Sequence, residues 1–359
     1  MKQEKTGYFP ALNGLRVFLA SMVFVYHYSG LGNYDLTLSQ ILVVLRYRMT
    51  FFFVLSGFVI AYSLLSKLPL SGKQYLNFIL SRLIRLLPLY LFLIVVPYIH
   101  VGIPAWPVFI TNITLTKGFF EKLLFTGIGP AWSLTTEITF YLFAPFILKY
   151  FRTRKSILIS YFLLVTTGLF LTLSGQYLNS IEANPFGFFS DIYFTLNITF
   201  FGRVTDFYAG MLLARLIYYF PDQRFLFLTK SKSLYAGVLL IIICCLLVYY
   251  FDNASFRYHT TLSLISLHLL LPFGVAYFLS GLIQGRSMVS KFFSYQWMVW
   301  LGNGAYGFYL MHNSWVQYKI QRINPFPDNG FILLWITAVM VYYIFEKPCI
   351  LFLRKRLPS

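Results

Sequence analysis

The sequence predicts an all-α integral membrane protein, a single bundle of about ten transmembrane helices with both termini cytoplasmic. Composition is the first reason: of 359 residues, 58% are hydrophobic and only 11% are charged, whereas soluble domains carry about 25% charged residues. The second reason is that apolar runs of helical length recur from one end of the chain to the other. The third is the placement of the basic residues, which cluster between these runs.

Each predicted span is an apolar stretch of about 20 residues, the length that crosses the hydrocarbon core of a bilayer. In chain order, the spans are predicted over residues 12–29, 49–66, 82–101, 133–150, 156–174, 198–219, 233–251, 261–283, 296–318 and 331–353. With this even number of spans, most Lys and Arg residues fall on the amino-terminal side, which is therefore cytoplasmic. The connecting segments are too short to bury a core of their own, so we expect one membrane domain over residues 1–359.

The formal charge of +18 does not indicate a nucleic-acid partner, because basic clusters between apolar spans set membrane topology. Cys244, Cys245 and Cys349 fall within predicted spans, and their spacing indicates neither a disulfide framework nor a metal site. The expected partner is the lipid bilayer, and we expect a multi-pass protein of a cell membrane.

The first predicted helix carries two residues that lipid disfavours, Arg16 and His27. They are separated by about three helical turns, or about 16 Å, so they share one stripe of the helix. Ionisable residues inside a span usually face the bundle interior or a watery cavity. A histidine at this position suits a general base that takes a proton from a hydroxyl; the alternative is an ordinary interfacial histidine at a helix end.

Arg82 and Arg85 lie one turn apart at the cytoplasmic mouth of the third predicted helix. Their planar guanidinium groups can bind a phosphate or pyrophosphate bidentately, as in a nucleotide-bearing cofactor such as coenzyme A. The alternative is an ordinary positively charged flank of a span.

Glu137 lies about one turn into the fourth predicted helix, for which Ser133 is the expected amino cap. Its carboxylate could orient a histidine or arginine, or accept a hydrogen bond from a sugar hydroxyl. The alternative is a solvated acid favoured by the helix dipole. His312 lies within the ninth predicted span, where a satisfied core histidine is the default interpretation.

The order of these motifs resembles the acyltransferase-3 family of multi-span membrane proteins. The resemblance covers nearly the whole chain and rests on Leu12-Asn13-Gly14-Leu15-Arg16 with His27, Phe52-Phe53-Val54-Leu55-Ser56-Gly57-Phe58, Arg82-x-x-Arg85 with Pro88, Trp132-Ser133-Leu134-x-x-Glu137, Tyr306-x-x-Tyr309-Leu310-x-His312, and Phe345-Glu346-Lys347-Pro348. Two positions depart from the family pattern: Asn13 replaces the usual Asp, and Arg48-Met49-Thr50 replaces an acidic residue before the paired phenylalanines. Some relatives carry a fused extracytoplasmic hydrolase-like domain, which we do not expect here.

The resemblance implies a membrane O-acyltransferase, most often an O-acetyltransferase, that moves an acetyl group from cytoplasmic acetyl-CoA, or another acyl-CoA, to a hydroxyl of a surface glycan. The implied acceptor is O-antigen or another part of lipopolysaccharide, capsule or exopolysaccharide, or a lipid-linked saccharide, and the implied location is a bacterial inner membrane.

For the site, we predict His27 as the base, Arg16 and Glu137 as catalytic partners, Arg82 and Arg85 on the coenzyme A phosphates, and Trp132, Tyr306 and His312 at the substrate. Direct transfer and an acyl-histidine relay both stay open. The competing interpretations are a transporter or flippase of a lipid-linked sugar, and a structural or receptor membrane protein.

Overall fold

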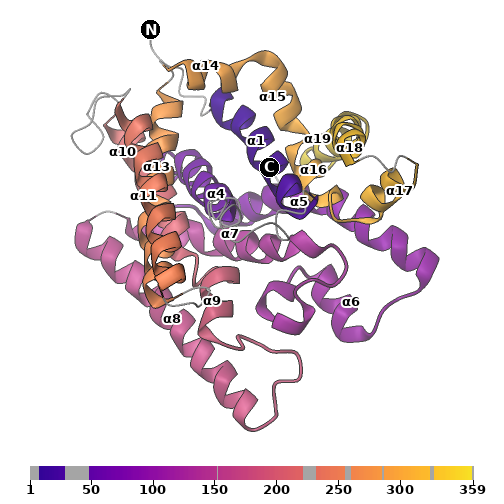
Figure 1. The fold of residues 1–359 in the computed structure, drawn as a ribbon, viewed down its shortest axis with the longest axis horizontal. Coiled ribbons are helices and arrows are strands. Elements are labelled where there is room, and N and C mark those ends of the chain that lie inside the picture. Colours follow the sequence, from indigo (N-terminus) through magenta and orange to yellow (C-terminus); the bar gives the residue numbers. More distant parts are fainter. Residues whose placement is uncertain are drawn as a thin grey trace. The chain divides into compact units, whose positions relative to one another are not determined.

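The structure, a computed structural model, describes residues 8–28, 48–151, 153–220, 232–254, 260–284, 287–323 and 327–357. The regular secondary structure of these residues is helical (Figure 1). They form no sheet, although an isolated bridge pairs Phe120 with Phe188. Residue 29, the last of the first predicted span, and the terminal residues 1–7 and 358–359 lie outside the described residues.

The helices belong to two compact units, each described by itself. Unit 1 comprises the described parts of residues 1–67 and 205–303. Its helices are α1 (Pro10–Tyr28), α4 (Arg48–Leu64), α10 (Val204–Tyr219), α11 (Lys232–Ala254), α12 (Thr261–Ile265), the π-helical turn η4 (Ser266–Leu270), α13 (Leu271–Ile283), α14 (Met288–Ser294) and α15 (Gln296–Asn303). In this unit α11 runs along α13, and α1 packs on α14 and α15.

Unit 2 comprises the described parts of residues 68–204 and 304–359. Its helices are α5 (Gly72–Val101), α6 (Trp106–Ile113), the short 3-10 turns η1 (Lys117–Phe119), η2 (Glu121–Leu123) and η3 (Gly129–Ala131), α7 (Trp132–Tyr150), α8 (Arg154–Ser180), α9 (Ile192–Ile198), α16 (Ala305–Met311), α17 (Trp315–Ile323), α18 (Pro327–Val341), the π-helical turn η5 (Tyr342–Glu346) and α19 (Lys347–Arg354).

Six helical stretches of the described chain are long and apolar enough to cross a membrane. They are Gly72–Val101, Gly129–Tyr150, Arg154–Ser180, Lys232–Asp252, Thr261–Ile283 and Gly330–Arg354, and each contains or overlaps a predicted span. α4 is apolar but shorter, with 17 residues, and α10 has 16. The 19 residues of α1 include Asn13, Arg16 and His27, which lower its hydropathy. The all-helical membrane architecture is thus confirmed, with six long spans among the ten predicted.

The predicted ninth span, 296–318, is wrong as a single helix. The chain there forms α15, α16 and α17, with breaks at Gly304 and at 312–314. Glycine weakens a helix interior, and at the second break the Ser314 hydroxyl donates to the Met311 carbonyl oxygen at 2.9 Å, a local bond that competes with the helical ladder.

Helix α5 begins ten residues before its predicted start. Ser71 and Gln74 form a capping box, in which the Ser71 hydroxyl accepts from the Gln74 amide and the Gln74 side chain accepts from the Ser71 amide. This box starts the helix in a polar stretch that hydropathy alone excludes. Arg82 and Arg85 therefore lie inside a continuous helix rather than at its first turn.

Glycines let the helices of unit 1 approach each other at backbone distance. A Cβ on Gly210 of α10 would lie 2.1 Å from the carbonyl oxygen of Val54 in α4, and one on Gly57 would lie 2.4 Å from the Phe207 carbonyl oxygen. Such contacts leave no room for a side chain, and close backbone approach through small residues is how helices associate in lipid.

We expect Gly210→Ala to destabilise unit 1 by about 1–3 kcal/mol, because the added methyl group forces α4 and α10 apart. A lower apparent melting temperature of the purified protein in detergent checks this. Gly72→Ala is the control, since nothing lies within 4 Å of a Cβ there. Equal melting temperatures for Gly210→Ala and the unmodified protein would contradict the packing.

Candidate functional site

Within unit 1, Arg16 lies at the contact between α1 and α15. The side-chain nitrogen Nδ2 of Asn13 donates to the Val299 carbonyl oxygen at 2.9 Å and to Asn303 Oδ1 at 3.1 Å. The side-chain oxygen Oδ1 of Asn13 accepts from Arg16 Nη1 at 3.4 Å. Asn13 supplies both a donor and an acceptor here, which an ionised Asp could not do. The departure from the family pattern at residue 13 thus has a structural use.

His27 lies near the end of α1 and bonds to the first residue of α4. Its Nε2 is 2.9 Å from Nη2 of Arg48. The Arg48 guanidinium carbon also lies over the Tyr26 ring, 4.4 Å from the ring centroid, a cation–π contact. Arg48 is 8% exposed. Sequence reasoning noticed Arg48 only as a missing acid and did not predict that it contacts the candidate base.

Within unit 2, Arg82 and Arg85 of α5 belong to a cluster of charged groups and phenols. Arg82 interacts electrostatically with Tyr141, Arg85, Arg354 and Glu137. Its Nε is buried and has no hydrogen-bond partner among the described residues, whereas the Arg85 side chain is exposed. The cluster therefore combines a buried guanidinium N–H without a hydrogen-bond partner among the described residues with one exposed guanidinium group.

Glu137 joins this cluster from α7. It accepts a short hydrogen bond from the hydroxyl of Tyr141, one turn further along the same helix. Tyr306 of α16 interacts electrostatically with both residues, and its hydroxyl donates to the Leu86 carbonyl oxygen at 2.7 Å. Three separate motifs predicted Arg82 with Arg85, Glu137 and Tyr306, and unit 2 brings these four residues together.

Glu346 is a member of the cluster that the site prediction missed. It is 4% exposed, it interacts electrostatically with Arg85, and its Oε1 has no hydrogen-bond partner among the described residues. A Cβ on Gly307 would lie 3.0 Å from that oxygen. Glu346 ends the π-helical turn η5, and such turns are frequent at functional sites. Its motif was visible in the sequence, but its contact with α5 is tertiary.

Trp132 and His312 lie beside a second polar network in unit 2. Ser133 and Tyr309 share a hydrogen bond of 2.8 Å, and both hydroxyls lie within 3.0 Å of the Pro130 carbonyl oxygen. His312 is fully buried, with Nδ1 2.5 Å from the Tyr309 carbonyl oxygen. A carbonyl can only accept, so Nδ1 carries the proton.

Ser133 is not the amino cap that the sequence predicts. The cap position of α7 is Ala131, because the 3-10 turn η3 runs directly into the helix. Trp132 is therefore the first residue of α7, and its side chain is partly exposed.

Lys117 fixes the segment that leads into Trp132. It is fully buried, and its Nζ donates to the carbonyl oxygens of Thr126 at 2.7 Å and Ile128 at 2.5 Å. Burial lowers the pKa of Lys117 to about 7. A neutral amine has two N–H donors, which matches the two carbonyl acceptors. Residues 102–131, which connect the third and fourth predicted spans, are thus held within unit 2.

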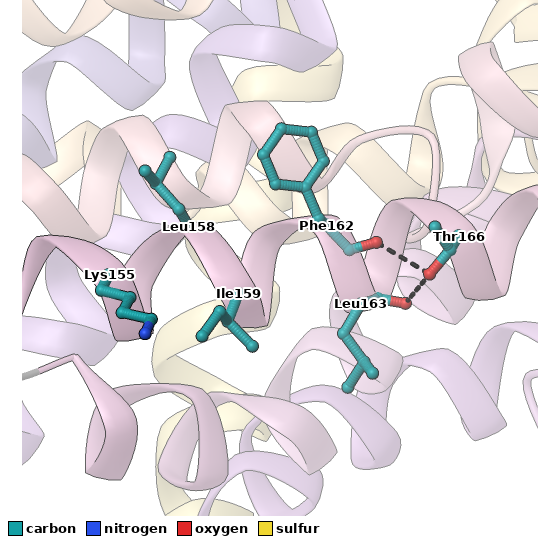
Figure 2. A pocket seen from close by; sticks show the side chains of 6 residues that line it. All are labelled: Lys155, Leu158, Ile159, Phe162, Leu163 and Thr166. Atoms are coloured by element: carbon teal, nitrogen blue, oxygen red, sulfur yellow. Dashed lines mark hydrogen bonds between the residues drawn. The ribbon is translucent and has the colours of Figure 1, made fainter.

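A hollow on α8 does not have the chemistry of a site (Figure 2). It is lined by Lys155, Leu158, Ile159, Phe162, Leu163 and Thr166. The Thr166 hydroxyl is 2.8 Å and 3.0 Å from the carbonyl oxygens of Phe162 and Leu163 in its own helix. With its hydroxyl satisfied, this face presents mainly hydrocarbon, as a lipid-facing surface does.

Ionisable groups inside the apolar helices of a membrane protein usually mark a site for a polar substrate or an ion. The arginines and glutamates described above place this protein in that class of membrane proteins. A family profile described as "Acyltransferase domain" matches residues 9–345 of the chain. The protein therefore belongs to the acyltransferase-3 family, as its motifs indicate. No curated protein and no solved structure matches the chain.

The Lys117 contact predicts a pH dependence of stability. The pKa of Lys117 is about 7 in the folded protein and about 10.5 when exposed, so between these values the unfolded chain binds more protons and the free energy of unfolding rises with pH. Thermal unfolding between pH 7 and pH 10 measures it; the slope is at most about 1.4 kcal/mol per pH unit. We expect Lys117→Met to lose the part of this slope that Lys117 contributes. Lys122→Met, at an exposed residue, is the control, and an unchanged slope in Lys117→Met would refute the assignment.

Proposed function

We propose that this acyltransferase moves an acetyl group from cytoplasmic acetyl-CoA, or another acyl group from its acyl-CoA, to a hydroxyl of a surface glycan or of a lipid-linked saccharide. The acceptor class is O-antigen or another part of lipopolysaccharide, capsule or exopolysaccharide, and the location is a bacterial inner membrane. Family membership over residues 9–345 is the observation that carries this proposal.

The donor side is assigned to unit 2. Arg82 and Arg85 hold the phosphates of coenzyme A, because a buried Nε on Arg82 and an exposed guanidinium on Arg85 both suit an anion. Glu137 balances part of the cluster's positive charge before the phosphates arrive. Trp132, Tyr306 and His312 are assigned to the substrate site, with Tyr306 and His312 held by the hydrogen bonds described above.

His27 serves as the base for the acyl transfer. It removes the proton from the acceptor hydroxyl while the oxygen attacks the thioester carbonyl carbon. The tetrahedral intermediate then collapses: the C–S bond breaks, an ester C–O bond remains on the sugar, and the coenzyme A thiolate takes up a proton. Arg16, about 16 Å from His27 along the same helix, is assigned to a contact with the acyl donor. The same residues are compatible with an acyl-histidine relay.

We expect His27→Ala to lower the rate of glycan acylation by about 10²–10⁴-fold, the usual contribution of a general base. The measurement uses the purified chain in nanodiscs, radiolabelled acetyl-CoA and glycan extracted from the host cells. His100→Ala is the matched control, because His100 is an exposed helix-end histidine whose Nδ1 bonds to the Val96 carbonyl oxygen. Full activity in His27→Ala would show that the base is elsewhere. Movement of a lipid-linked sugar without any label would identify a flippase instead.

Arg82→Gln and Arg85→Gln are each expected to raise the KM for acetyl-CoA by about tenfold or more, since each removes a charge-assisted hydrogen bond. Arg85→Lys is a second variant, because Arg85→Gln also deprives the buried Glu346 of its cation. Arg322→Gln is the control, at an exposed arginine of α17. The donor site would have to be reassigned if all variants showed the KM of the unmodified protein.

A further inference from the structure

The contact between Arg48 and His27 determines where the imidazole carries its proton. A guanidinium group has only N–H donors and stays protonated in proteins. In the 2.9 Å contact between Nη2 and Nε2, Arg48 must therefore donate and Nε2 must accept. A histidine that accepts at Nε2 is neutral and holds its proton on Nδ1.

In this arrangement His27 cannot serve as a base. The lone pair of Nε2 is bonded to Arg48, and Nδ1 already carries a proton. Base catalysis requires a free lone pair within reach of the acceptor hydroxyl. The reaction therefore needs Arg48 to exchange its partner before the hydroxyl loses its proton.

An anion is the partner that a guanidinium group prefers to an imidazole. Its planar fork matches a carboxylate or a phosphate bidentately, and these charge-assisted bonds are stronger than neutral ones. The Tyr26 ring, 4.4 Å from the guanidinium carbon, supports the cation from one face, and an anion would bind at the edge nitrogens of the guanidinium group. Arg48 is also the first residue of α4, at the end that the topology prediction assigns to the outer side, which is the side of a surface glycan under the proposed function.

We propose that Arg48 recognises an anionic group on the acceptor and that this binding releases Nε2 of His27 to act as the base. The inference rests on the proposed acyl transfer and specifies its acceptor as an anionic saccharide. The charge can be a carboxylate on the sugar or a phosphate of a lipid carrier, since both fit the guanidinium fork.

The first experiment compares matched acceptors. The full chain in nanodiscs receives labelled acetyl-CoA with methyl glycosides of hexoses, with the corresponding uronic acids, and with a prenyl diphosphate hexose. We expect kcat/KM for a charged acceptor to exceed that of its neutral counterpart by about tenfold or more. Arg48→Gln should lose this preference and Arg48→Lys should keep part of it. Arg322→Gln, which removes an arginine that also lies over a tyrosine ring, should leave it unchanged. The uronic acid and diphosphate arms separate the two sources of charge.

The second experiment observes the imidazole directly and does not depend on transfer. Nitrogen NMR of the 15N-histidine-labelled chain identifies His27 by the signals lost in His27→Gln. We expect a proton on Nδ1 and an accepting Nε2, and we expect methyl glucuronoside or inorganic pyrophosphate, but not methyl glucoside, to shift the Nε2 signal. In Arg48→Gln neither anion should shift it.

The outcomes separate the two proposals. A proton on Nε2, or no response to either anion, overturns the role of Arg48 even when acyl transfer is observed. An unchanged acceptor preference in a folded Arg48→Gln does the same. If the unmodified protein labels no saccharide at all, the acyl transfer itself is contradicted, and the NMR result still decides whether Arg48 exchanges His27 for an anion.

Discussion

The packing of unit 1 requires the backbones of neighbouring helices to come into direct contact. In lipid, apolar side chains gain little from leaving their surroundings, so close packing and polar contacts must hold the helices together. A Cβ on Gly302 of α15 would lie 2.3 Å from the carbonyl oxygen of Asn13 in α1. That approach brings the Asn13 amide to Val299 and Asn303, and through Asn13 it holds Arg16. The position of a candidate catalytic cation thus follows from the absence of one side chain on the neighbouring helix.

Unit 2 solves a different problem, because it places several charged groups, of which Glu346 is buried and Arg85 and Arg354 are exposed, among apolar helices. Three guanidinium groups, on Arg82, Arg85 and Arg354, share one region with the carboxyl groups of Glu137 and Glu346. An isolated ion is very costly in a low-dielectric interior, whereas opposite charges stabilise each other. The cluster is nevertheless not closed, because Nε of Arg82 and Oε1 of Glu346 have no hydrogen-bond partner among the described residues. These two polar atoms are the part of the cluster that a bound ligand would have to satisfy under the proposed function.

The sequence predicted features that depend on neighbouring residues, such as apolar helices and the spacing of residues along them. It did not predict contacts between residues that are distant in the chain. Hydropathy located the long apolar helices, and the one-turn spacing of Arg82 and Arg85 placed both on one helix. The early start of α5 was missed because hydropathy ignores a polar first turn, although Ser71 and Gln74 spell a capping box. The ninth span was predicted as continuous because its composition is apolar across Gly304. The contacts of Glu346 and Arg48 were not predicted for another reason. Glu346 interacts with Arg85, which is far away in the sequence, and Arg48 bonds to His27, which belongs to a different helix.

The long, exposed helix α8 relates unit 2 to the thickness of the bilayer. With 27 residues at about 1.5 Å each, it is about 40 Å long, which exceeds the hydrocarbon core of about 30 Å but matches a bilayer with its headgroup regions. Leu163 and Phe170 are exposed on it, at 65% and 68%, and its Thr and Ser hydroxyls bond to their own helix, so its middle tolerates lipid. An upright α8 brings Lys155 and Asn179, near its two ends, to opposite headgroup layers. A thinner membrane would tilt α8, so the enzyme's activity should vary with acyl-chain length of the surrounding lipids.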